Sequence, residues 1–362
     1  MLIISIVNVF AIFFALFASY TPNNKKYFIF SFLLIFIFLA IRYDFGNDYM
    51  AYYYYFSDVH QTSVKDLLSF KDYQSLGLKE FGYTWLNKVF PSFYLMVAFL
   101  SLFSCYIYYY SIKSYVTQRL MWFSVFIFLV NPSLMLVQSS AMRQTVAIGL
   151  FLYSIKYLIE RNIWKYCMLI LLGSLFHVSA IVLLPMYLIV TPKYWSRGVM
   201  IALVICFVFV AFFGYIFLES IGNISRQYFP AYEDAYMTDI IGNPLKSGLG
   251  FLFLSCTFLF ILWSHNKGVA HNIVISKLSI IGFVLSPIGM YLNMFGRIGM
   301  YFEPAIILSL PFAISLQKSW QNRIIIISVF VLFYLFNFYE FFQNPIWVEK
   351  FSTYKTFLFR AL

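Results

Sequence analysis

Charged side chains are scarce in this chain of 362 residues. Only 11% of the residues are charged, 62% are hydrophobic, and the mean hydropathy is +0.81. A soluble globular domain carries about 25% charged residues. The composition therefore excludes an ordinary soluble domain and predicts an all-α, polytopic integral membrane protein that lies in the lipid bilayer.

Cysteines are few, and the signatures of several common catalytic sites are missing. The sequence contains no HExxH, no GxxxxGK[ST] and no GxSxG motif. It also has no acidic cluster dense enough to enclose a divalent metal. Four cysteines lie in apolar stretches without metal-ligand spacing, so we expect neither a metal site nor a disulfide. They are Cys105, Cys167, Cys206 and Cys256. We expect a protein that uses no metal, nucleotide or other cofactor.

Basic residues outnumber acidic ones, 25 to 14, which gives a net charge of +11. The excess does not predict a nucleic-acid partner, because the basic residues are scattered among hydrophobic segments without an aromatic-basic surface motif. The positive-inside rule of membrane proteins explains it better. The apolar run at the N-terminus lacks a basic leader and a cleavage site, so we expect a retained first span rather than a signal peptide.

Runs of about 20 apolar residues predict the membrane spans. With an ambiguous segment at 166–190 they make about 11 spanning helices in a single multi-span domain, residues 1–362. The other ten lie near 2–20, 27–41, 93–111, 120–137, 144–160, 198–218, 247–264, 278–295, 299–316 and 324–341. Two polar stretches, 42–92 and 219–246, are too long to be turns and predict larger loops.

The distribution of Lys and Arg predicts the orientation. One set of short connections carries 13 of the 25 basic residues and one acidic residue, Glu160, and we expect it to be cytoplasmic. Its basic members are Lys25, Lys26, Lys113, Arg119, Lys156, Arg161, Lys165, Lys193, Arg197, Lys267, Lys277, Lys318 and Arg323. Loops 42–92 and 219–246 are then on the outer face. His265 and His271 fall in a predicted cytoplasmic loop, where we expect them to be solvated.

Segment 166–190 lies between two basic connections that should both be cytoplasmic. Only about 27 residues separate these connections, too few for two full spans at about 1.5 Å per residue. We predict a broken or re-entrant segment with its polar apex at residues 173–179. The alternative is one ordinary span, which would invert the side of every later loop.

Six charged or titratable residues fall on the predicted outer face. Such groups are costly at membrane depth and indicate a functional site. They are Arg42, Arg143, Arg297, His177, Asp48 and Glu80.

Three of these residues, Arg42, Asp48 and Glu80, lie in the first predicted outer loop near aromatic residues. Gly46 permits a tight turn and Asp48 suits it. The tyrosines that follow offer faces and hydroxyls for sugar rings, although an ordinary aromatic belt with a snorkelling Arg42 is the alternative. Glu80 lies further along, as a base or an acceptor-binding carboxylate if other site residues accompany it.

Two arginines have the local sequence of anion sites. Arg143 follows Ser139 and Ser140 at the start of a predicted helix, where first-turn amides and a guanidinium favour phosphate. Arg297 lies next to Gly296, between two predicted spans. The alternative for either arginine is an interfacial anchor.

His177 is the histidine at the predicted break. A lone histidine on an apolar face is more often structural, but at membrane depth it becomes a candidate general base or, when protonated, a phosphate donor. Asp48 and Glu80 are the rival bases.

The order and spacing of these motifs resemble the signature of the EpsG/Wzy-type polysaccharide polymerases across nearly the whole chain. The final match, Tyr354-Lys355, is loose. The matching runs are Arg42-Tyr-x-x-Gly46-x-Asp48-Tyr49-x-x-Tyr52, Glu80-x-Gly82-Tyr83, Arg143-Gln144, Glu160-Arg161, Phe176-His177-x-Ser179-Ala180 with Pro185, and Arg297 with Tyr301-Phe302.

The resemblance implies a bacterial inner-membrane, multi-pass glycosyltransferase whose site faces the periplasm. Such enzymes join oligosaccharide repeat units carried on undecaprenyl diphosphate, as donor and acceptor, into O-antigen (lipopolysaccharide), capsule or exopolysaccharide. A chain-length regulator is a possible further partner. The implied catalytic residues are His177, Asp48 and Glu80. The implied diphosphate-binding residues are Arg143, Arg297 and Arg42, and the implied sugar-binding residues are Tyr49, Tyr52 and Tyr83.

Two other functions fit the same residues. A lipid-linked oligosaccharide flippase also needs a basic cavity, although internal repeats are common among transporters and none is evident here. A membrane acyltransferase that modifies surface polysaccharide also uses His and Arg.

Overall fold

The computed structural model describes residues 1–21, 26–68, 80–228, 248–291 and 293–359. Helices account for most of them, which confirms the all-α class. The chain forms two compact units. The first comprises Met1–Ser154, Trp164–Leu184 and Gln317–Leu362, and the second comprises Ile155–Ile163 and Pro185–Leu316. The expected single multi-span domain stays a prediction.

The first unit holds the chain's beginning and end. Its helices are α1 (Leu2–Tyr20), α2 (Lys26–Ala40), α3 (Tyr49–Gln61), α4 (Val64–Leu68), α5 (Phe81–Val89), α6 (Phe93–Tyr115), η1 (Gln118–Leu120), α7 (Met121–Val130), α8 (Met135–Ser140), α10 (Ile163–Ser174), η2 (Val178–Leu183), α18 (Trp320–Phe341), α19 (Pro345–Phe351) and η4 (Phe357–Phe359). Helix α9 (Met142–Ile159) begins in this unit.

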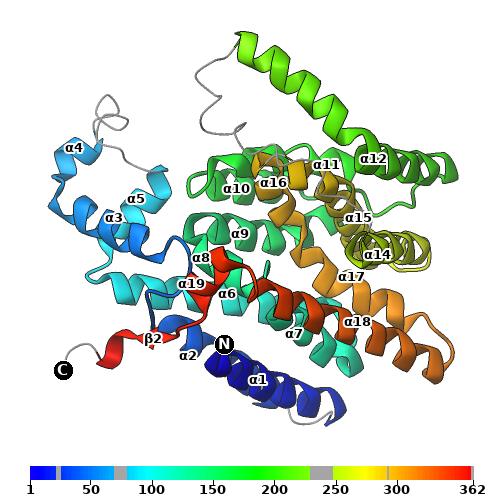
Figure 1. The fold of residues 1–362 in the computed structure, drawn as a ribbon, viewed down its shortest axis with the longest axis horizontal. Helices are drawn as coiled ribbons and strands as arrows, with labels where there is room; N and C mark the ends of the chain where they lie inside the picture. The colour runs from blue at the N-terminus through cyan, green and yellow to red at the C-terminus, as the bar shows by residue number, and fades with distance from the viewer. Residues whose placement is uncertain (22–25, 69–79, 229–247, 292, 360–362) are drawn as a thin grey trace. The chain divides into compact units, whose positions relative to one another are not determined.

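Small residues let the first two helices pack closely. Ala11 and Ala15 of α1 are fully buried, and Ser31 of α2 donates a hydrogen bond to the carbonyl of Ala11 at 2.8 Å. Small and hydroxyl side chains allow this approach between apolar helices. Helix α1 also contacts α7, and α2 contacts α6, so these four helices pack together as one group (Figure 1).

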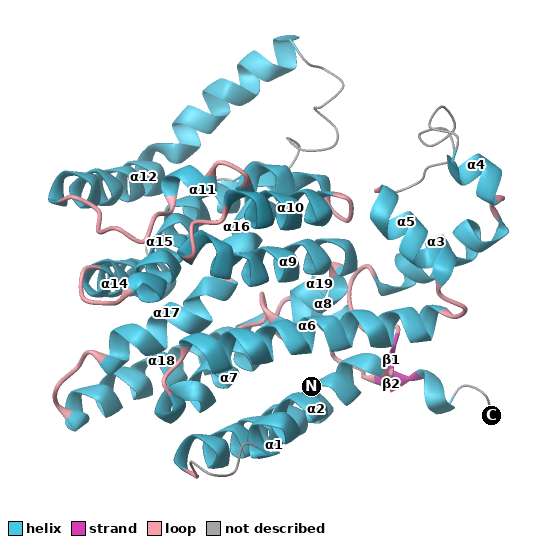
Figure 2. Cartoon of the chain, turned by 180° about the vertical axis from the view of Figure 1, so that it is seen from behind, coloured by secondary structure: helices cyan, strands magenta, loops and turns pink. Residues whose placement is uncertain are grey.

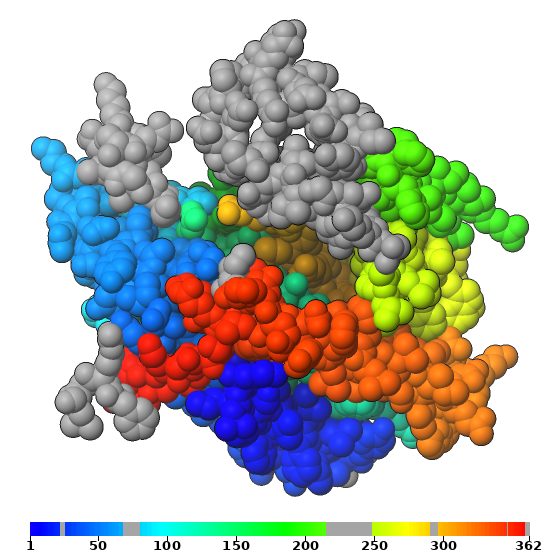
Figure 3. Space-filling view, in the orientation of Figure 1, coloured from blue at the N-terminus to red at the C-terminus, as the bar shows by residue number. Residues whose placement is uncertain are grey.

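A short antiparallel pairing joins the C-terminal segment to the residues that follow α2. Strand β1 (Arg42–Tyr43) pairs with β2 (Lys355–Thr356), with Arg42 opposite Thr356 (Figure 2). The terminal amine of Met1 donates to the carbonyl of Ser352 at 2.6 Å. The C-terminal segment, red in Figure 3, accordingly lies against the N-terminal helices in blue. The loosely matching Tyr354-Lys355 thus adjoins the Arg42 motif.

The predicted loop 42–92 is largely helical. It contains α3, α4 and α5 in the described residues, and α3 packs against α5. Its tyrosines form an aromatic core with Phe93 at the start of α6. The sequence predicts these aromatic residues at the membrane interface. In the structure they pack against one another instead, because α3 and α5 face each other.

The segment at 163–189 breaks and folds back, as predicted. Helix α10 ends at Ser174, and η2 begins at Val178. Within the first unit, the hydroxyl of Tyr166 donates to the carbonyl of Leu183 at 2.6 Å. Within the second, Arg161 Nη1 donates to the carbonyl of Tyr187 at 2.7 Å. One straight span at 166–190 is excluded by these contacts; the membrane face of the break stays a prediction.

The second unit contains the later apolar helices. They are α11 (Met186–Ile189), α12 (Arg197–Tyr228), α14 (Leu249–His265), α15 (Ala270–Tyr291), α16 (Asn293–Phe302) and α17 (Pro304–Ser315). Helix α12 continues ten residues into the predicted loop 219–246, whose remainder lies outside the described residues.

Two expectations for the second unit are wrong. Arg297 lies inside α16 rather than in a turn between two spans. The bend in this part of the chain, 46°, comes after Arg297, between Phe302 and Pro304. His265 is fully buried rather than solvated, and its Nε2 accepts a hydrogen bond from the backbone amide of Trp195 at 3.4 Å.

Long apolar helices are fewer than the predicted 11 spans. Among the described residues, five helices are long and apolar enough to cross a membrane, or six if the bent α16–α17 pair is one span. They lie at Leu2–Tyr20, Phe93–Tyr115, Arg197–Gly214, Ala270–Gly289 and Trp320–Phe341. Five further apolar helices are shorter, because breaks such as Asn131-Pro132 divide the apolar runs. The structure supports a multi-pass membrane protein, and the exact span count is not confirmed.

Candidate functional site

Glu80 lies at the centre of a charged cluster in the first unit. It occupies the N-cap position of α5, and its side chain is 17% exposed. One carboxylate oxygen, Oε2, accepts a hydrogen bond from Arg143 Nη1, and the other, Oε1, lies 3.1 Å from His177 Nδ1. Three residues predicted separately from sequence are therefore in direct contact.

His177 reaches Glu80 because the chain breaks at the end of α10. Its backbone is extended, with φ −154° and ψ 110°, and it caps η2. A carboxylate only accepts hydrogen bonds, so the contact assigns the proton of the neutral imidazole to Nδ1. Nε2 then carries the lone pair. A carboxylate that fixes the tautomer in this way prepares a histidine for proton transfer.

Arg143 lies in the first turn of α9, and its side chain is 22% exposed. Its Nε donates to the hydroxyl of Tyr52 at 3.5 Å, and its guanidinium carbon lies 5.9 Å from the centre of that ring. Glu80 and Tyr52 use two of the five N–H donors of the guanidinium. The remaining donors and the partial exposure allow Arg143 to bind an anion.

A backbone contact fixes Glu80 opposite His177. The amide of Gly82 donates to the carbonyl of Leu175 at 2.7 Å. A Cβ at residue 82 would lie 2.9 Å from that carbonyl oxygen, closer than real side chains approach. Residue 82 must therefore be glycine for α5 to lie against the break. The signal in the sequence is the glycine two residues after Glu80, in the run Glu80-x-Gly82-Tyr83.

Burial and neighbouring groups shift the pKa of Glu80 in opposite directions. Burial raises the pKa of its carboxyl, but the hydrogen bond from His177 and the charge of Arg143 outweigh burial and lower the pKa to about 2. Glu80 therefore stays ionised at neutral pH. An ionised carboxylate that already accepts two hydrogen bonds orients its partners better than it takes a further proton.

Asp48 is exposed at the turn that begins α3. Its amide donates to Ser140 Oγ at 3.1 Å, which joins the turn to the residues before Arg143. The preceding Gly46 has φ +117°, a conformation that favours glycine, and its backbone lies against Ser140. The predicted tight turn at Gly46 is confirmed, and Asp48 lies at the edge of the same cluster.

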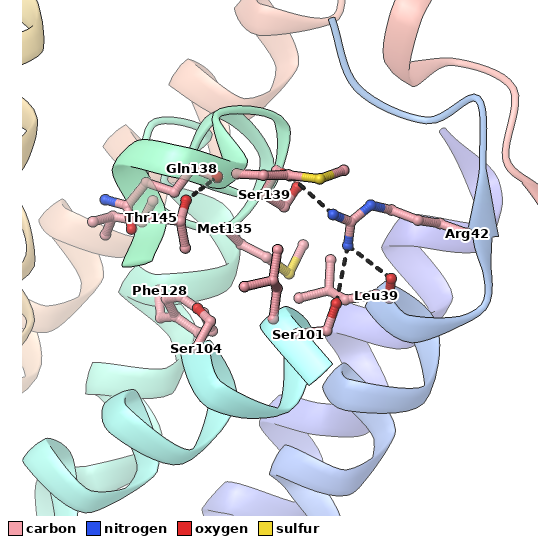
Figure 4. A pocket seen from close by; sticks show the side chains of 12 residues that line it. Leu39, Arg42, Ser101, Ser104, Phe128, Met135, Gln138, Ser139 and Thr145 are labelled. Carbon is pink, nitrogen blue, oxygen red and sulfur yellow. Dashed lines mark hydrogen bonds between the residues drawn. The ribbon is translucent and has the colours of Figure 1, made fainter. Parts of the chain in front are cut away.

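Arg42 is buried, with 3% of its surface exposed. It donates to the carbonyls of Leu39 at 2.7 Å and Ser139 at 2.9 Å, and to Ser101 Oγ at 3.3 Å (Figure 4). A cavity of about 20 Å³ beside it has room for about one water molecule. In this position Arg42 ties the end of α2 to α6 and α8, and a diphosphate has no access to it.

The tyrosines predicted to bind sugars lie in the core. Tyr49 and Tyr83 are fully buried, and Tyr52 is nearly so. Tyr83 stacks on Tyr55 at 5.9 Å, and Tyr49 donates to the carbonyl of Arg42 at 2.8 Å. Because no face of Tyr49 or Tyr83 is open, neither can stack on a sugar in this structure. Tyr52 instead positions Arg143.

Arg297 lies in the second unit with an exposed side chain. Its predicted contact with the same diphosphate as Arg143 stays a prediction. No group of three or more His, Cys, Asp or Glu side chains gathers in metal-binding geometry among the residues that the structure describes. The predicted independence from metals and nucleotides is not tested by that finding.

Comparison with known families identifies the chain. A model of the EpsG family matches residues 25–356, which include every residue of the Glu80–His177–Arg143 cluster. No curated protein and no solved structure matches. Since the match covers most of the 362 residues, the chain belongs to the EpsG family of glycosyltransferase-like polysaccharide polymerases of the membrane.

Proposed function

We propose that this protein polymerises oligosaccharide repeat units carried on undecaprenyl diphosphate, at the outer face of the bacterial inner membrane. The observation that carries the proposal is the contact of Glu80 with both His177 and Arg143. The contact supports the proposal because it brings a candidate base and a candidate phosphate-binding group together on one carboxylate.

The reaction needs two kinds of assistance. An acceptor hydroxyl attacks the anomeric carbon of the donor sugar, and the bond from that carbon to the diphosphate oxygen breaks. The proton of the hydroxyl moves to His177 Nε2, and the electron pair of the broken bond leaves with the lipid diphosphate. General base catalysis of this kind typically contributes about 10²- to 10⁴-fold in rate.

Arg143 stabilises the charge that develops on the leaving diphosphate. Its guanidinium is held in place by Glu80 and Tyr52 before the substrate binds. Pre-organised donors of this type contribute about 3 kcal/mol to the transition state, or about 100-fold in rate. In this proposal Asp48 is the alternative base.

The test is complementation of a polymerase-null strain. Correctly inserted His177→Ala and Arg143→Ala variants should leave single repeat units on the cell surface, with about 100-fold less polymer. Lys156→Gln, which removes a lysine from the same helix as Arg143, should restore full-length polymer. Full-length polymer from both alanine variants would contradict the assignment of the site.

The same strain separates the alternative functions. Loss of a flippase leaves no surface sugar, and loss of an acyltransferase changes substituents but not chain length. Single repeat units in the null strain therefore support a polymerase alone.

A further inference from the structure

A second cavity lies in the first unit, at the end of the four-helix group where α1 and α6 end and α2 and α7 begin. Its volume is about 220 Å³. Ala18, Phe28 and Met121 form its apolar floor, and Thr21, Lys113 and Gln118 lie at its polar rim. None of the residues that line it belongs to the Glu80–His177–Arg143 cluster.

The charge around this cavity has one sign. Residues 1–43 and 81–159 contain no Asp or Glu, so the helices that bound the cavity contribute no carboxylate. They contribute exposed basic residues at the same ends: Lys26 of α2, Lys113 of α6 and Arg119 of η1. A ligand that complements this rim carries negative charge.

Lys113 is held beside the cavity. Its Nζ donates to the hydroxyl of Tyr109 at 3.1 Å and lies 5.2 Å from the centre of that ring. The ring in turn packs on Phe28, at 5.1 Å between centroids. The contact with Tyr109 uses one of the three ammonium hydrogens, so Lys113 keeps donors for a phosphate.

The apolar floor requires more than a small anion. Phe28 and Ala18 are buried, and the volume exceeds that of several water molecules at about 30 Å³ each. Phe13 and Phe17 of α1 and Phe30 of α2 are exposed on the outer faces of the same helices. These faces offer apolar surface for acyl chains next to the basic rim.

We propose that this cavity binds the headgroup of an anionic glycerophospholipid, with its phosphate at Lys113 and its acyl chains along α1 and α2. Lys26, Lys113 and Arg119 all belong to the set of basic residues predicted to be cytoplasmic. Basic pockets between helices on that side bind anionic headgroups, and each basic residue contributes about 1 kcal/mol. The site is independent of the proposed polymerase reaction.

The experiment is native mass spectrometry of the full-length protein in neutral detergent. Phosphatidylglycerol and phosphatidylcholine with identical acyl chains are added in equal amounts, and the retained lipid is counted. The wild type should retain the anionic lipid at least about fivefold better, which corresponds to about 1 kcal/mol. Lys113→Gln should remove most of that preference. Met121→Trp, which fills the floor without changing charge, should lower retention of the anionic lipid.

Lys156→Gln is the matched control, because it removes a lysine whose side chain is 41% exposed but does not line the cavity, and it should leave the preference unchanged. Should Met121→Trp fail to fold, Lys113→Gln carries the test, since the lysine is exposed. Equal retention of the two lipids by the wild type, or an unchanged preference in Lys113→Gln, would overturn the proposal. Displacement of the lipid by millimolar inorganic phosphate would also overturn it, because the site would then bind a free anion.

Discussion

His177 Nδ1 lies 3.1 Å from Glu80 Oε1, across a sequence separation of 97 residues. The contact joins the break after α10 to the start of α5. It distinguishes the two carboxylates that compete for a catalytic role, because Glu80 is engaged by His177 and Arg143, whereas Asp48 is exposed. In the proposed reaction Glu80 is therefore a positioning residue, and His177 is the stronger candidate for the base.

Replacing Glu80 with glutamine should slow polymerisation through His177. We expect a fall of about 10- to 100-fold, the usual cost of losing a carboxylate that orients a functional histidine. The measurement is polymer formation by purified protein between pH 5 and 9. Full activity of Glu80→Gln would contradict the positioning role, and Glu160→Gln is the control.

The lowered pKa of Glu80 predicts how stability depends on pH. Its folded-state pKa of about 2 lies below the ordinary value of 4.5, so its ionised form stabilises the folded state above about pH 4.5. That contribution disappears as the pH falls toward 2. The wild type should therefore unfold at a higher temperature than Glu80→Gln at pH 7, and the difference should shrink between pH 5 and pH 3. A difference that is constant with pH would show that the carboxylate is not responsible.

Gly82→Ala should weaken both the fold and the activity. The new Cβ would lie 2.9 Å from the carbonyl oxygen of Leu175, and this oxygen belongs to backbone rather than to a flexible side chain. Helix α5 must then move away from the break, and Glu80 moves with it. We expect a lower midpoint of thermal unfolding and at least a tenfold loss of polymer formation, as about 1 Å of misplacement can cost 100-fold.

Gly250→Ala tests whether any glycine substitution has the same effect. Gly250 lies in α14, and a Cβ there would have no neighbour within 4 Å. Alanine is favoured over glycine inside a helix by about 1 kcal/mol. This control should therefore retain the activity and unfold at an equal or higher temperature.

Much of the helical pattern could be predicted from the sequence, because apolar runs and breaks act locally. The spans at 2–20 and 27–41 match α1 and α2 within one residue, and the fold-back after α10 followed from charge and length. The contacts of Glu80 could not be predicted in this way. Glu80, Arg143 and His177 meet through tertiary packing, which periodicity does not report.

The predicted sugar-binding tyrosines are buried, so their abundance in the sequence did not indicate an exposed surface. The run from Tyr52 to Tyr55 after a polar turn predicts a surface that binds sugars, yet an α-helix brings only residues three or four apart to the same face. Tyr52 and Tyr55 are buried, whereas Tyr54 is exposed. Helical periodicity applied to that run would have assigned Tyr52 and Tyr55 to one face.

Arg42 should act on stability rather than on the chemical step. Its replacement by alanine leaves the carbonyls of Leu39 and Ser139 without their donors inside the protein. Losing hydrogen bonds to buried groups costs about 1–3 kcal/mol each, so we expect Arg42→Ala to lower the free energy of unfolding by on the order of 3 kcal/mol. Arg42→Lys keeps the charge but presents one nitrogen instead of a fork, and should recover only part of the loss.

Thermal unfolding in detergent, measured beside polymer formation, separates anchoring by Arg42 from diphosphate binding. Arg197→Ala is the control, because Arg197 is an exposed arginine at the start of α12 and its loss should leave the unfolding midpoint unchanged. An anchoring Arg42 lowers the midpoint, and polymer formation falls in proportion to the folded protein. A diphosphate-binding Arg42 would instead give a normally stable variant whose rate falls about 100-fold. That second result would require the buried hydrogen bonds of Arg42 to open during the reaction, and it would restore the role that the sequence predicted.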